Sequence, residues 1–502
     1  MILGVMRMKL KRVLKIVTLA LVLCLAAGTG LFLYNSYHVY NINAGFTSLP
    51  LNYNPRDSSS TYTWNGVDVT VYGGFVKGIQ KGKDGNQLVI RALSPLPAVA
   101  VKAANTSVQN VLISIENINP GFYSSSIDKN LKPARITVNT LEFSMNLSVG
   151  ETRRIDPVQP SKTADDNYAI LGDSRDGYET FGKILEQVNA LKPVFVIDNG
   201  DLVYSGKPNQ YRIFNQMTSG ISTTLCTTLG NHDIRGDGRE TYKKLYGPEY
   251  YSFDFGDNHF IFLDSSCGYA EKQAIPDVQY VWLERDLQKA QGKRILVISH
   301  VPPTDPRSGV KPNEVQSYTD KVEKEGGFVE KKLEAYSEDE SIDHGFQTKQ
   351  EAARFENLMT KYKVDTVYLS HIHSYFDYTK NDVRYIISGG AGAELMTQNS
   401  YYHYLIAKVG ATDTLTMVQL PSPPNLILQR YAATVSLFAN AMYKENRLAV
   451  VFFIAGFILL VVLLLMLLFI RLNHRLSLFW NLIKDTGRFI SKRYRELYKS
   501  KG

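Results

Sequence analysis

The chain has 502 residues, and its shares of hydrophobic and charged residues, 44% and 21%, are those of a folded protein, which excludes wholesale disorder. This length accommodates two soluble domains in addition to membrane segments. The formal net charge is +8, but the basic excess flanks the two long apolar segments near the ends of the chain. A nucleic-acid-binding protein would carry such an excess on its folded body, so no nucleic-acid partner is expected.

The first predicted element is an apolar segment at residues 16–34, which follows five basic residues. This pattern is typical of a cleavable signal peptide or of a retained signal anchor. Small residues at 26–30 offer a cleavage region, whereas residues 31–34 continue the apolar stretch and favour retention. Both interpretations place the following part of the chain, about residues 40–446, outside the cytoplasm.

Residues 61–155 contain short runs that alternate between apolar and polar side chains. In the clearest run, residues 67–72, strand geometry places three valines on one face. Further runs of this kind lie at 87–92, 111–115 and 136–141. The pattern predicts a small β-sandwich domain, and no catalytic group of residues is found in it.

After a polar linker at 155–164, apolar runs alternate with helix-like stretches up to about residue 420. The helical spacing is clearest at 181–191 and at 355–362. Strands that alternate with helices predict an α/β domain, here residues 165–420. The expected strands are 168–171, 194–197, 223–229, 260–263, 295–298, 366–369 and 385–387.

Residues 448–470 carry no charge and are long enough to span a bilayer core, which takes about 20 residues. Residues 471–502 contain nine Lys or Arg but only two acidic residues, so this basic tail is predicted to be cytoplasmic. The tail is either a basic amphipathic helix on an anionic leaflet or a solvated tail. The helical spacing rests on Leu476, Trp480, Ile483, Ile490, Tyr494 and Leu497.

Five of the predicted strands end in residue types that bind metals. Each motif alone is explained by a turn or by an ordinary polar contact, but the carboxyl ends of strands in α/β sheets are where ligands bind. Carboxylates combined with imidazoles suit Mn, Fe or Zn. The motifs are Gly172-Asp173-Ser174-Arg175, Asn199-Gly200-Asp201-Leu202-Val203-Tyr204, Gly230-Asn231-His232-Asp233, Ser299-His300 and Ser370-His371-Ile372-His373.

With these motifs in this order, about residues 165–410 resemble the calcineurin-like metallophosphoesterase superfamily. The resemblance implies a β-sandwich of two sheets flanked by helices that holds two metal ions. It also implies three protein ligands for each metal ion, and one ligand of the first ion bridges to the second. The implied ligands are Asp173, Asp201 (bridging) and His373 for the first metal, and Asn231, His300 and His371 for the second.

The sequence departs from the family at two positions, Arg175 where many members have His and Ser370 where they have Gly. The first departure removes a metal ligand. The spacing from Asp201 to Tyr204 resembles that of purple acid phosphatases, in which such a tyrosine binds ferric iron, and the alternative is a packed tyrosine. Arg175 is expected either to contact the substrate phosphate or to pair with an acid.

The function implied is that of a membrane-anchored, metal-dependent phosphoester hydrolase acting on a phosphorylated substrate. Two metal ions, of Fe, Mn or Zn, activate a hydroxide for in-line attack on phosphorus. The family's non-ligand histidine corresponds to His232, which serves the leaving oxygen.

Two alternatives remain open from the sequence. One is a phosphodiesterase acting on nucleotides or lipid headgroups, and the other is a non-catalytic binding ectodomain with a degenerate site. A long polar insertion at 304–349 is either a lid that selects the substrate or a solvated excursion.

Overall fold

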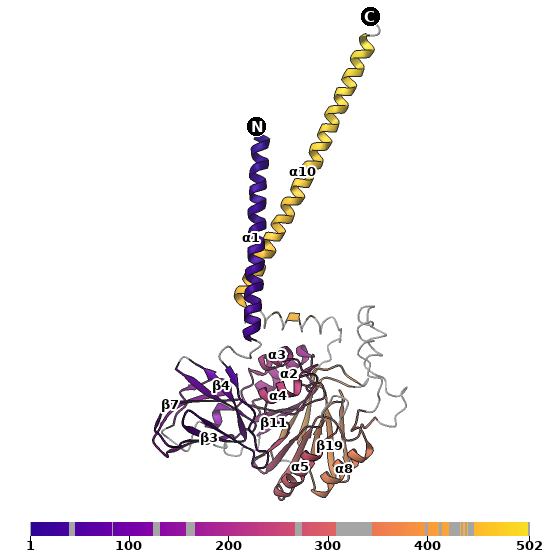
Figure 1. Ribbon diagram of the computed structural model, residues 1–502. Coiled ribbons are helices and arrows are strands. Elements are labelled where there is room, and N and C mark those ends of the chain that lie inside the picture. The colour runs from indigo at the N-terminus through magenta and orange to yellow at the C-terminus, as the bar shows by residue number, and fades with distance from the viewer. Residues whose placement is uncertain are drawn as a thin grey trace. The chain divides into compact units, whose positions relative to one another are not determined.

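A computed structural model describes residues 2–39, 46–82, 84–123, 131–156, 166–266, 274–307, 344–396, 400–410, 414–420 and 446–499, and also residues 432, 435, 436 and 439. The chain divides into two compact units, shown in Figure 1. One unit is Gly45–Phe438, and the other joins Met1–Ala44 to Ala439–Gly502. Each unit is described below by itself.

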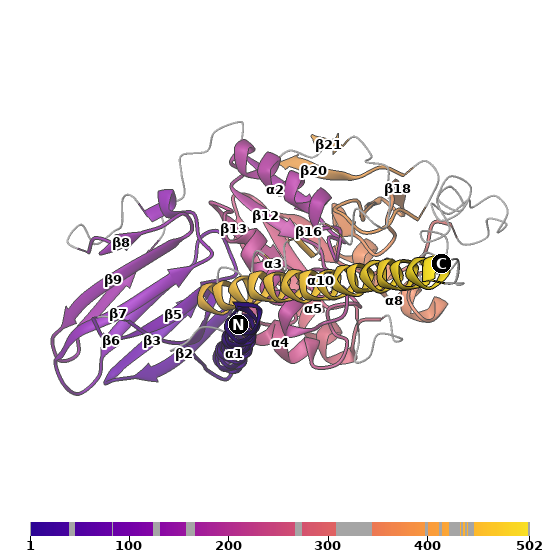
Figure 2. The ribbon, with the colours of Figure 1, turned by 90° about the horizontal axis from the view of Figure 1, so that it is seen from above.

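The larger unit begins with two facing sheets whose strands are mostly antiparallel (Figure 2). This is the β-sandwich that the alternating pattern predicted. Val67, Val69 and Val71 are fully buried between the sheets, so the predicted inward face is confirmed. The six-stranded sheet has the order β1 (Phe46–Ser48), β4 (Gly74–Lys81), β5 (Asn86–Ala92), β7 (Val108–Glu116), β9 (Thr140–Leu147), β8 (Arg135–Ile136). The four-stranded sheet has the order β10 (Thr152–Ile155), β6 (Ala98–Ala103), β3 (Val67–Tyr72), β2 (Ser59–Trp64).

One sequence expectation in this region is wrong. Residues 136–141 were expected to form one strand, but they span the end of β8, a turn and the start of β9. The two strands pair antiparallel, with Ile136 opposite Leu141. Thr137 N–H donates to the Thr140 carbonyl oxygen across the turn at 2.9 Å, so the apolar residues at both ends of the run belong to different strands of a hairpin.

The second part of this unit is a mixed α/β sandwich, and all seven predicted strands are present in it. Both sheets contain parallel strands that are buried on both faces, which explains why their sequences are continuous apolar runs. One sheet has the order β13 (Thr224–Thr227), β12 (Phe195–Asp198), β11 (Asn167–Leu171), β20 (His403–Lys408), β21 (Leu415–Gln419). The other has the order β14 (Tyr251–Phe255), β15 (Asn258–Leu263), β16 (Arg294–Ser299), β17 (Thr366–Leu369), β19 (Val383–Ser388), β18 (Tyr375–Lys380).

Five described helices accompany these sheets. The two helical patterns read from the sequence correspond to α2 (Tyr178–Leu191) and α8 (Lys349–Lys361). Thr348 caps α8, since its hydroxyl accepts a hydrogen bond from the Glu351 N–H at 3.2 Å, a pattern that the sequence carries as Thr-x-x-Glu. The other helices are α3 (Pro208–Thr218), α4 (Gly238–Leu245) and α5 (Asp277–Lys289).

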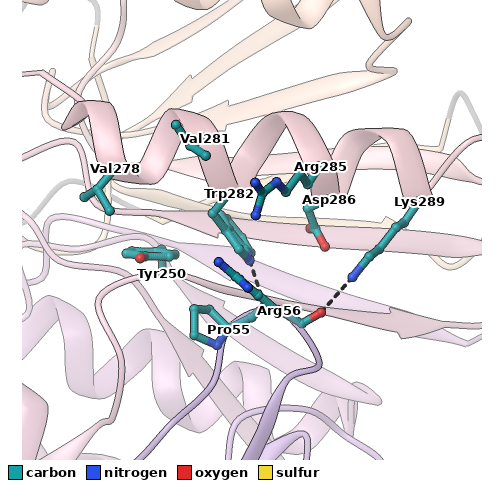
Figure 3. Close-up of a pocket in the computed structure, with 9 residues that line it drawn as sticks. All are labelled: Pro55, Arg56, Tyr250, Val278, Val281, Trp282, Arg285, Asp286 and Lys289. Atoms are coloured by element: carbon teal, nitrogen blue, oxygen red, sulfur yellow. Dashed lines mark hydrogen bonds between the residues drawn. The ribbon is translucent and has the colours of Figure 1, made fainter.

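The β-sandwich and the α/β part share one continuous hydrophobic core. At their junction the Trp282 indole N–H donates to the Pro55 carbonyl oxygen, and Lys289 Nζ donates to the Arg56 carbonyl oxygen, both at 2.7 Å (Figure 3). The pocket drawn there is lined by α5, by residues 55–56 and by Tyr250, and it contains none of the predicted site residues. The β-sandwich is therefore packed directly against the α/β part.

The smaller unit consists of α1 (Ile2–Val39) and α10 (Arg447–Lys499), which lie antiparallel. Leu25 of α1 meets Gly456 of α10, and Gly28 meets Phe453, with an added Cβ on either glycine falling 3.2 Å from the facing side chain. Both helices contain stretches that are long and apolar enough to cross a membrane, judged by length and composition alone.

The basic tail is continuous with the predicted membrane segment in α10. Its apolar residues Leu476, Trp480, Ile483 and Ile490 are exposed. The side chains of Tyr494 and Leu497 lie outside the described residues. The tail is helical, and its placement on an anionic leaflet stays a prediction.

Candidate metal centre

The strand ends of both sheets of the α/β part bring the predicted ligands together. Asp173 follows β11, Asp201 follows β12 and His300 follows β16. One ligand atom from each of these three buried residues lies within 4.8 Å of the others. His300 Nε2 is 3.4 Å from Asp201 Oδ1 and 3.9 Å from Asp173 Oδ1. His373 Nε2 joins the group at 3.4 Å from Asp173 Oδ1.

The backbone at the site is held in an unusual conformation. Asp173, Asp201 and His371 have φ angles of 59°, 54° and 69°, in the left-handed region that costs an ordinary residue about 1–2 kcal/mol. The Asp173 N–H donates to the Gly200 carbonyl oxygen at 3.1 Å, which ties the first two strand ends together. Such strain persists where the surrounding fold fixes it, and here it turns three predicted ligands toward one point.

Gly230 permits the closest of these approaches. A Cβ atom at this position would fall 2.2 Å from both the backbone nitrogen and Oδ1 of Asp201. The motif Gly230-Asn231 thus needs glycine first, because the Asp201 loop occupies the space of a side chain.

The histidines are oriented by backbone carbonyl groups. His300 Nδ1 lies 2.8 Å from the Asn199 carbonyl oxygen, and His373 Nδ1 contacts the Glu394 carbonyl oxygen. An imidazole that donates from Nδ1 presents its other nitrogen as an acceptor, which is the form that binds metals. Both Nε2 atoms face the Asp173 and Asp201 carboxylates.

The donor set fits a metal centre. Within the described parts of the chain, four buried ligand atoms at this site have no hydrogen-bond partner: Asp173 Oδ1, Asn231 Oδ1, His300 Nε2 and His371 Nε2. Buried polar atoms are rarely left unpaired. Asp173, Asp201 and His300 also bring ligand atoms within 4.8 Å of one another, so these donors fit a bound cation. Burial and the neighbouring His300 lower the pKa of His371 well below its ordinary value, which keeps its imidazole neutral.

His232 lies at the edge of this centre among cationic groups. Its Nδ1 is 2.6 Å from the Tyr204 carbonyl oxygen, while Arg175 Nη1 and Arg235 Nη2 lie 2.6 and 3.1 Å from Nε2. These contacts place the imidazole proton on Nδ1. Burial, then Arg175, lowers the pKa of His232 to about 3. The His232 N–H donates to Asp201 Oδ1 at 2.9 Å, which links the edge to the centre.

The two departures from the family pattern are accommodated by their neighbours. Arg175 forms an ion pair with Glu394 at 2.8 Å, so it does pair with an acid. Ser370 is buried and donates to the Ser388 carbonyl oxygen at 3.0 Å. The space for its hydroxyl exists because Gly172 lies opposite, where a Cβ would fall 2.2 Å from Ser370 Oγ.

Tyr204 packs against the same cationic edge. Its ring centroid is 5.6 Å from the Arg175 guanidinium and 5.3 Å from the His232 ring, and 41% of the residue is exposed. These are ring contacts with neighbouring side chains, and both the ligand role and the packing role of Tyr204 stay predictions.

If Tyr204 is a packing residue, the purified protein should be colourless and Tyr204→Phe should leave its absorption spectrum and metal content unchanged. The measurement is visible absorption together with elemental analysis of both proteins. An intense visible band that Tyr204→Phe abolishes would instead identify the phenolate as a ligand of ferric iron.

Sequence reasoning did not single out several residues of the site. Arg235 and Glu394 contact the predicted residues His232 and Arg175, and the ring of His344 lies beside that of His371. Asp233 accepts hydrogen bonds from the N–H groups of Val203 and Gly230, so it shapes two of the loops. Only Asp233 had a sequence signal, since it ends a predicted motif.

Part of the chain is similar in sequence to known phosphoesterases. A family model described as calcineurin-like phosphoesterase matches residues 167–375. Glycerophosphodiester phosphodiesterase GpdQ of Enterobacter lignolyticus is 30% identical over 129 residues, covering 24% of this chain and 46% of that protein. The probable GpdQ of Arcobacter nitrofigilis is 27% identical over 137 residues, covering 25% and 47%. The chain thus spans a little under half the length of these curated relatives.

Solved structures give weaker likenesses. A purple acid phosphatase from yellow lupin (Lupinus luteus) seeds has a TM-score of 0.36 at 13% identity, covering 70% of this chain and 76% of that one. A dimetal phosphatase from Danio rerio has a TM-score of 0.34 at 10% identity, covering 52% and 100%. Likenesses at this level do not bear on function.

Residues 167–375 therefore match the calcineurin-like phosphoesterases, and the resemblance read from the sequence is confirmed. The enzyme class that it implies is a phosphoric ester hydrolase, and the two curated relatives are described by names of that class.

Proposed function

We propose that residues 165–420 form a two-metal phosphoester hydrolase. The observation that carries this proposal is the meeting of buried ligand atoms of Asp173, Asp201 and His300, from three strand ends, within 4.8 Å of one another. Asp173, Asp201 and His373 are the proposed ligands of one metal, and Asn231, His300 and His371 join Asp201 at the other. When bound, the metal ions polarise phosphoryl oxygens and lower the pKa of water.

The residues at the edge of the centre are proposed to bind the ester. Arg175 and Arg235 bring guanidinium groups to His232 Nε2, where a planar fork matches phosphate oxygens. Glu394 holds Arg175 in place through its ion pair. His232 is proposed to stand at the leaving oxygen, and its link to Asp201 keeps it at a fixed distance from the metal ligands.

A phosphodiester substrate is the second candidate, because two curated relatives are named as glycerophosphodiester phosphodiesterases. Purified full-length protein should be assayed on a generic aryl phosphate monoester and on its diester. Hydrolysis of the diester at the higher kcat/KM would favour the second candidate. A protein that binds two metals and hydrolyses neither ester would be the non-catalytic binding ectodomain.

We further propose that α1 and α10 anchor the protein, with the domain outside the cytoplasm. Basic residues flank both apolar stretches on the side away from residues 40–446. The packing of Gly28 on Phe453 supports retention of the N-terminal segment as a helix of the pair.

Protease added to intact cells should therefore digest the domain and spare the C-terminal tail. The measurement is immunoblotting with one tag in the domain and one after α10, with permeabilised cells as the control. Protection of the domain in intact cells would contradict this topology.

A further inference from the structure

The part of α10 that follows the apolar stretch at 448–470 has two distinct faces. At about 3.6 residues per turn, the apolar side chains between residues 472 and 493 all fall within an arc of about 200°. The remaining arc of about 160° carries only polar side chains, among them Lys484, Arg488 and Lys492. The apolar face consists of Leu472, Leu476, Leu478, Phe479, Trp480, Leu482, Ile483, Phe489 and Ile490.

The apolar face is exposed over its whole length. Exposure of its side chains runs from 44% for Ile483 to 66% for Leu482. The contacts of α1 with α10 lie elsewhere, at Phe453 and Gly456 inside the apolar stretch. A contiguous exposed apolar surface of this kind marks a site of interaction with a protein or a membrane.

The tail also carries a large excess of positive charge. Asp485 is the one acidic residue between 471 and 493, and its Oδ1 lies 3.7 Å from Arg488 Nη1, with both side chains exposed. The charge excess calls for a partner that is negative as well as apolar. The basic residues are Arg471, Arg475, Lys484, Arg488, Lys492 and Arg493.

These features favour a lipid surface over a second copy of the chain. A two-stranded coiled coil buries a narrow seam, whereas the apolar face of the tail covers more than half of the helix circumference. A second copy would also bring an equally positive helix, and like charges repel. Lys and Arg on one face with Trp, Phe and Leu on the other are typical of helices that lie in a membrane interface.

Contact with a leaflet requires that α10 bends after the span. The helix is continuous from Arg447 to Lys499. If it continued straight, Ile490 would stand about 30 Å beyond residue 470, at a rise of about 1.5 Å per residue. Asn473 and His474, two of the weaker helix formers, lie directly after the span and provide the place for the bend.

We propose that residues 472–493 bind anionic phospholipids, with the apolar face of the tail lying in the leaflet at which the span of α10 ends. The bend falls at Asn473 and His474. This inference rests on the proposed span of α10 and is independent of the hydrolase function.

The test uses full-length protein reconstituted in phosphatidylcholine vesicles with or without phosphatidylglycerol. Brominated lipids quench a tryptophan that lies among acyl chains, and the Trp480 signal is the difference between the wild type and Trp480→Phe. Trp480 should be quenched in vesicles that contain phosphatidylglycerol and less so in phosphatidylcholine alone. The quenching should fall as salt is added, because salt screens the attraction.

Ile483→Glu and Ser477→Glu form a matched pair, since each adds one acid but on opposite faces of the tail. Ile483→Glu should abolish the quenching of Trp480. Ser477→Glu should keep most of it, because one charge near an anionic surface changes binding by about fivefold. Combining Lys484→Gln with Arg488→Gln should lower the ratio of bound to free tail by about 20- to 30-fold.

The outcomes separate the tail from the span. Trp480 that stays unquenched in both kinds of vesicle would overturn the inference, as would equal effects of the two glutamate variants. Disulfide-linked dimers of Ile483→Cys in both kinds of vesicle would also overturn it and identify a second copy as the partner. Extraction of the protein by alkaline carbonate would overturn the proposed span, while the quenching of Trp480 would still decide the role of the tail.

Discussion

Asp201→Asn should lose bound metal and hydrolysis together. Asp201 is 1% exposed, lies 3.4 Å from His300 Nε2 and is the one residue proposed to bind both metals. Asparagine keeps the shape of the side chain but removes the negative charge that two neighbouring cations require. We expect kcat/KM on an aryl phosphate to fall by at least about 10³-fold, equivalent to about 4 kcal/mol of transition-state stabilisation.

Elemental analysis and steady-state kinetics on the same preparations check this prediction. Asp237→Asn, the same change at an exposed position before α4, is the matched control and should behave as wild type. If Asp201→Asn keeps two metals and full activity, the proposed metal centre is wrong.

His232→Ala should keep both metals and slow the chemical step. The substitution retains the backbone N–H that donates to Asp201 Oδ1, so the metal ligands stay in place. It removes the imidazole that Arg175 and Arg235 contact at the edge of the centre. In the free protein His232 is neutral and its Nε2 accepts from two guanidinium groups, so a general-acid role requires that the bound ester draws Arg175 and Arg235 away and that Nε2 is then protonated. A loss of about 10²- to 10⁴-fold in kcat is expected if the residue then serves the leaving oxygen.

A series of aryl phosphates with increasingly poor leaving groups measures this role. The effect of His232→Ala should grow along the series, because a poor leaving group depends most on the residue that stabilises it. Full turnover of His232→Ala on the poorest leaving group would show that the assigned role is wrong.

Strand periodicity and strand ends explain why so much of the α/β part could be read from sequence. A run such as Phe195–Asp198 is buried on both faces and is followed three residues later by the proposed ligand Asp201, so its apolar character and the polar residues after it are both visible locally. The prediction of one strand at residues 136–141 was wrong because this segment is a tight hairpin between β8 and β9. The apolar residues Ile136 and Leu141 face each other across the hairpin, and in the sequence they look like two positions of one strand.

The part of the site that escaped prediction depends on contacts between distant segments. Glu394 pairs with Arg175 across more than two hundred residues, and Asp305 holds His344 from the other stem of a long insertion. The left-handed backbone of Asp173 and His371 likewise comes from the surrounding loops. No local pattern in the sequence records such contacts.

Reversible chelation of the purified full-length protein, followed by hydrolysis of an aryl phosphate, tests the proposed two-metal hydrolase. We expect hydrolysis to vanish when metal is removed and to return in proportion to metal added, up to two ions per chain. Hydrolysis that survives complete removal of metal, or full activity with no more than one ion per chain, would contradict the two-metal site.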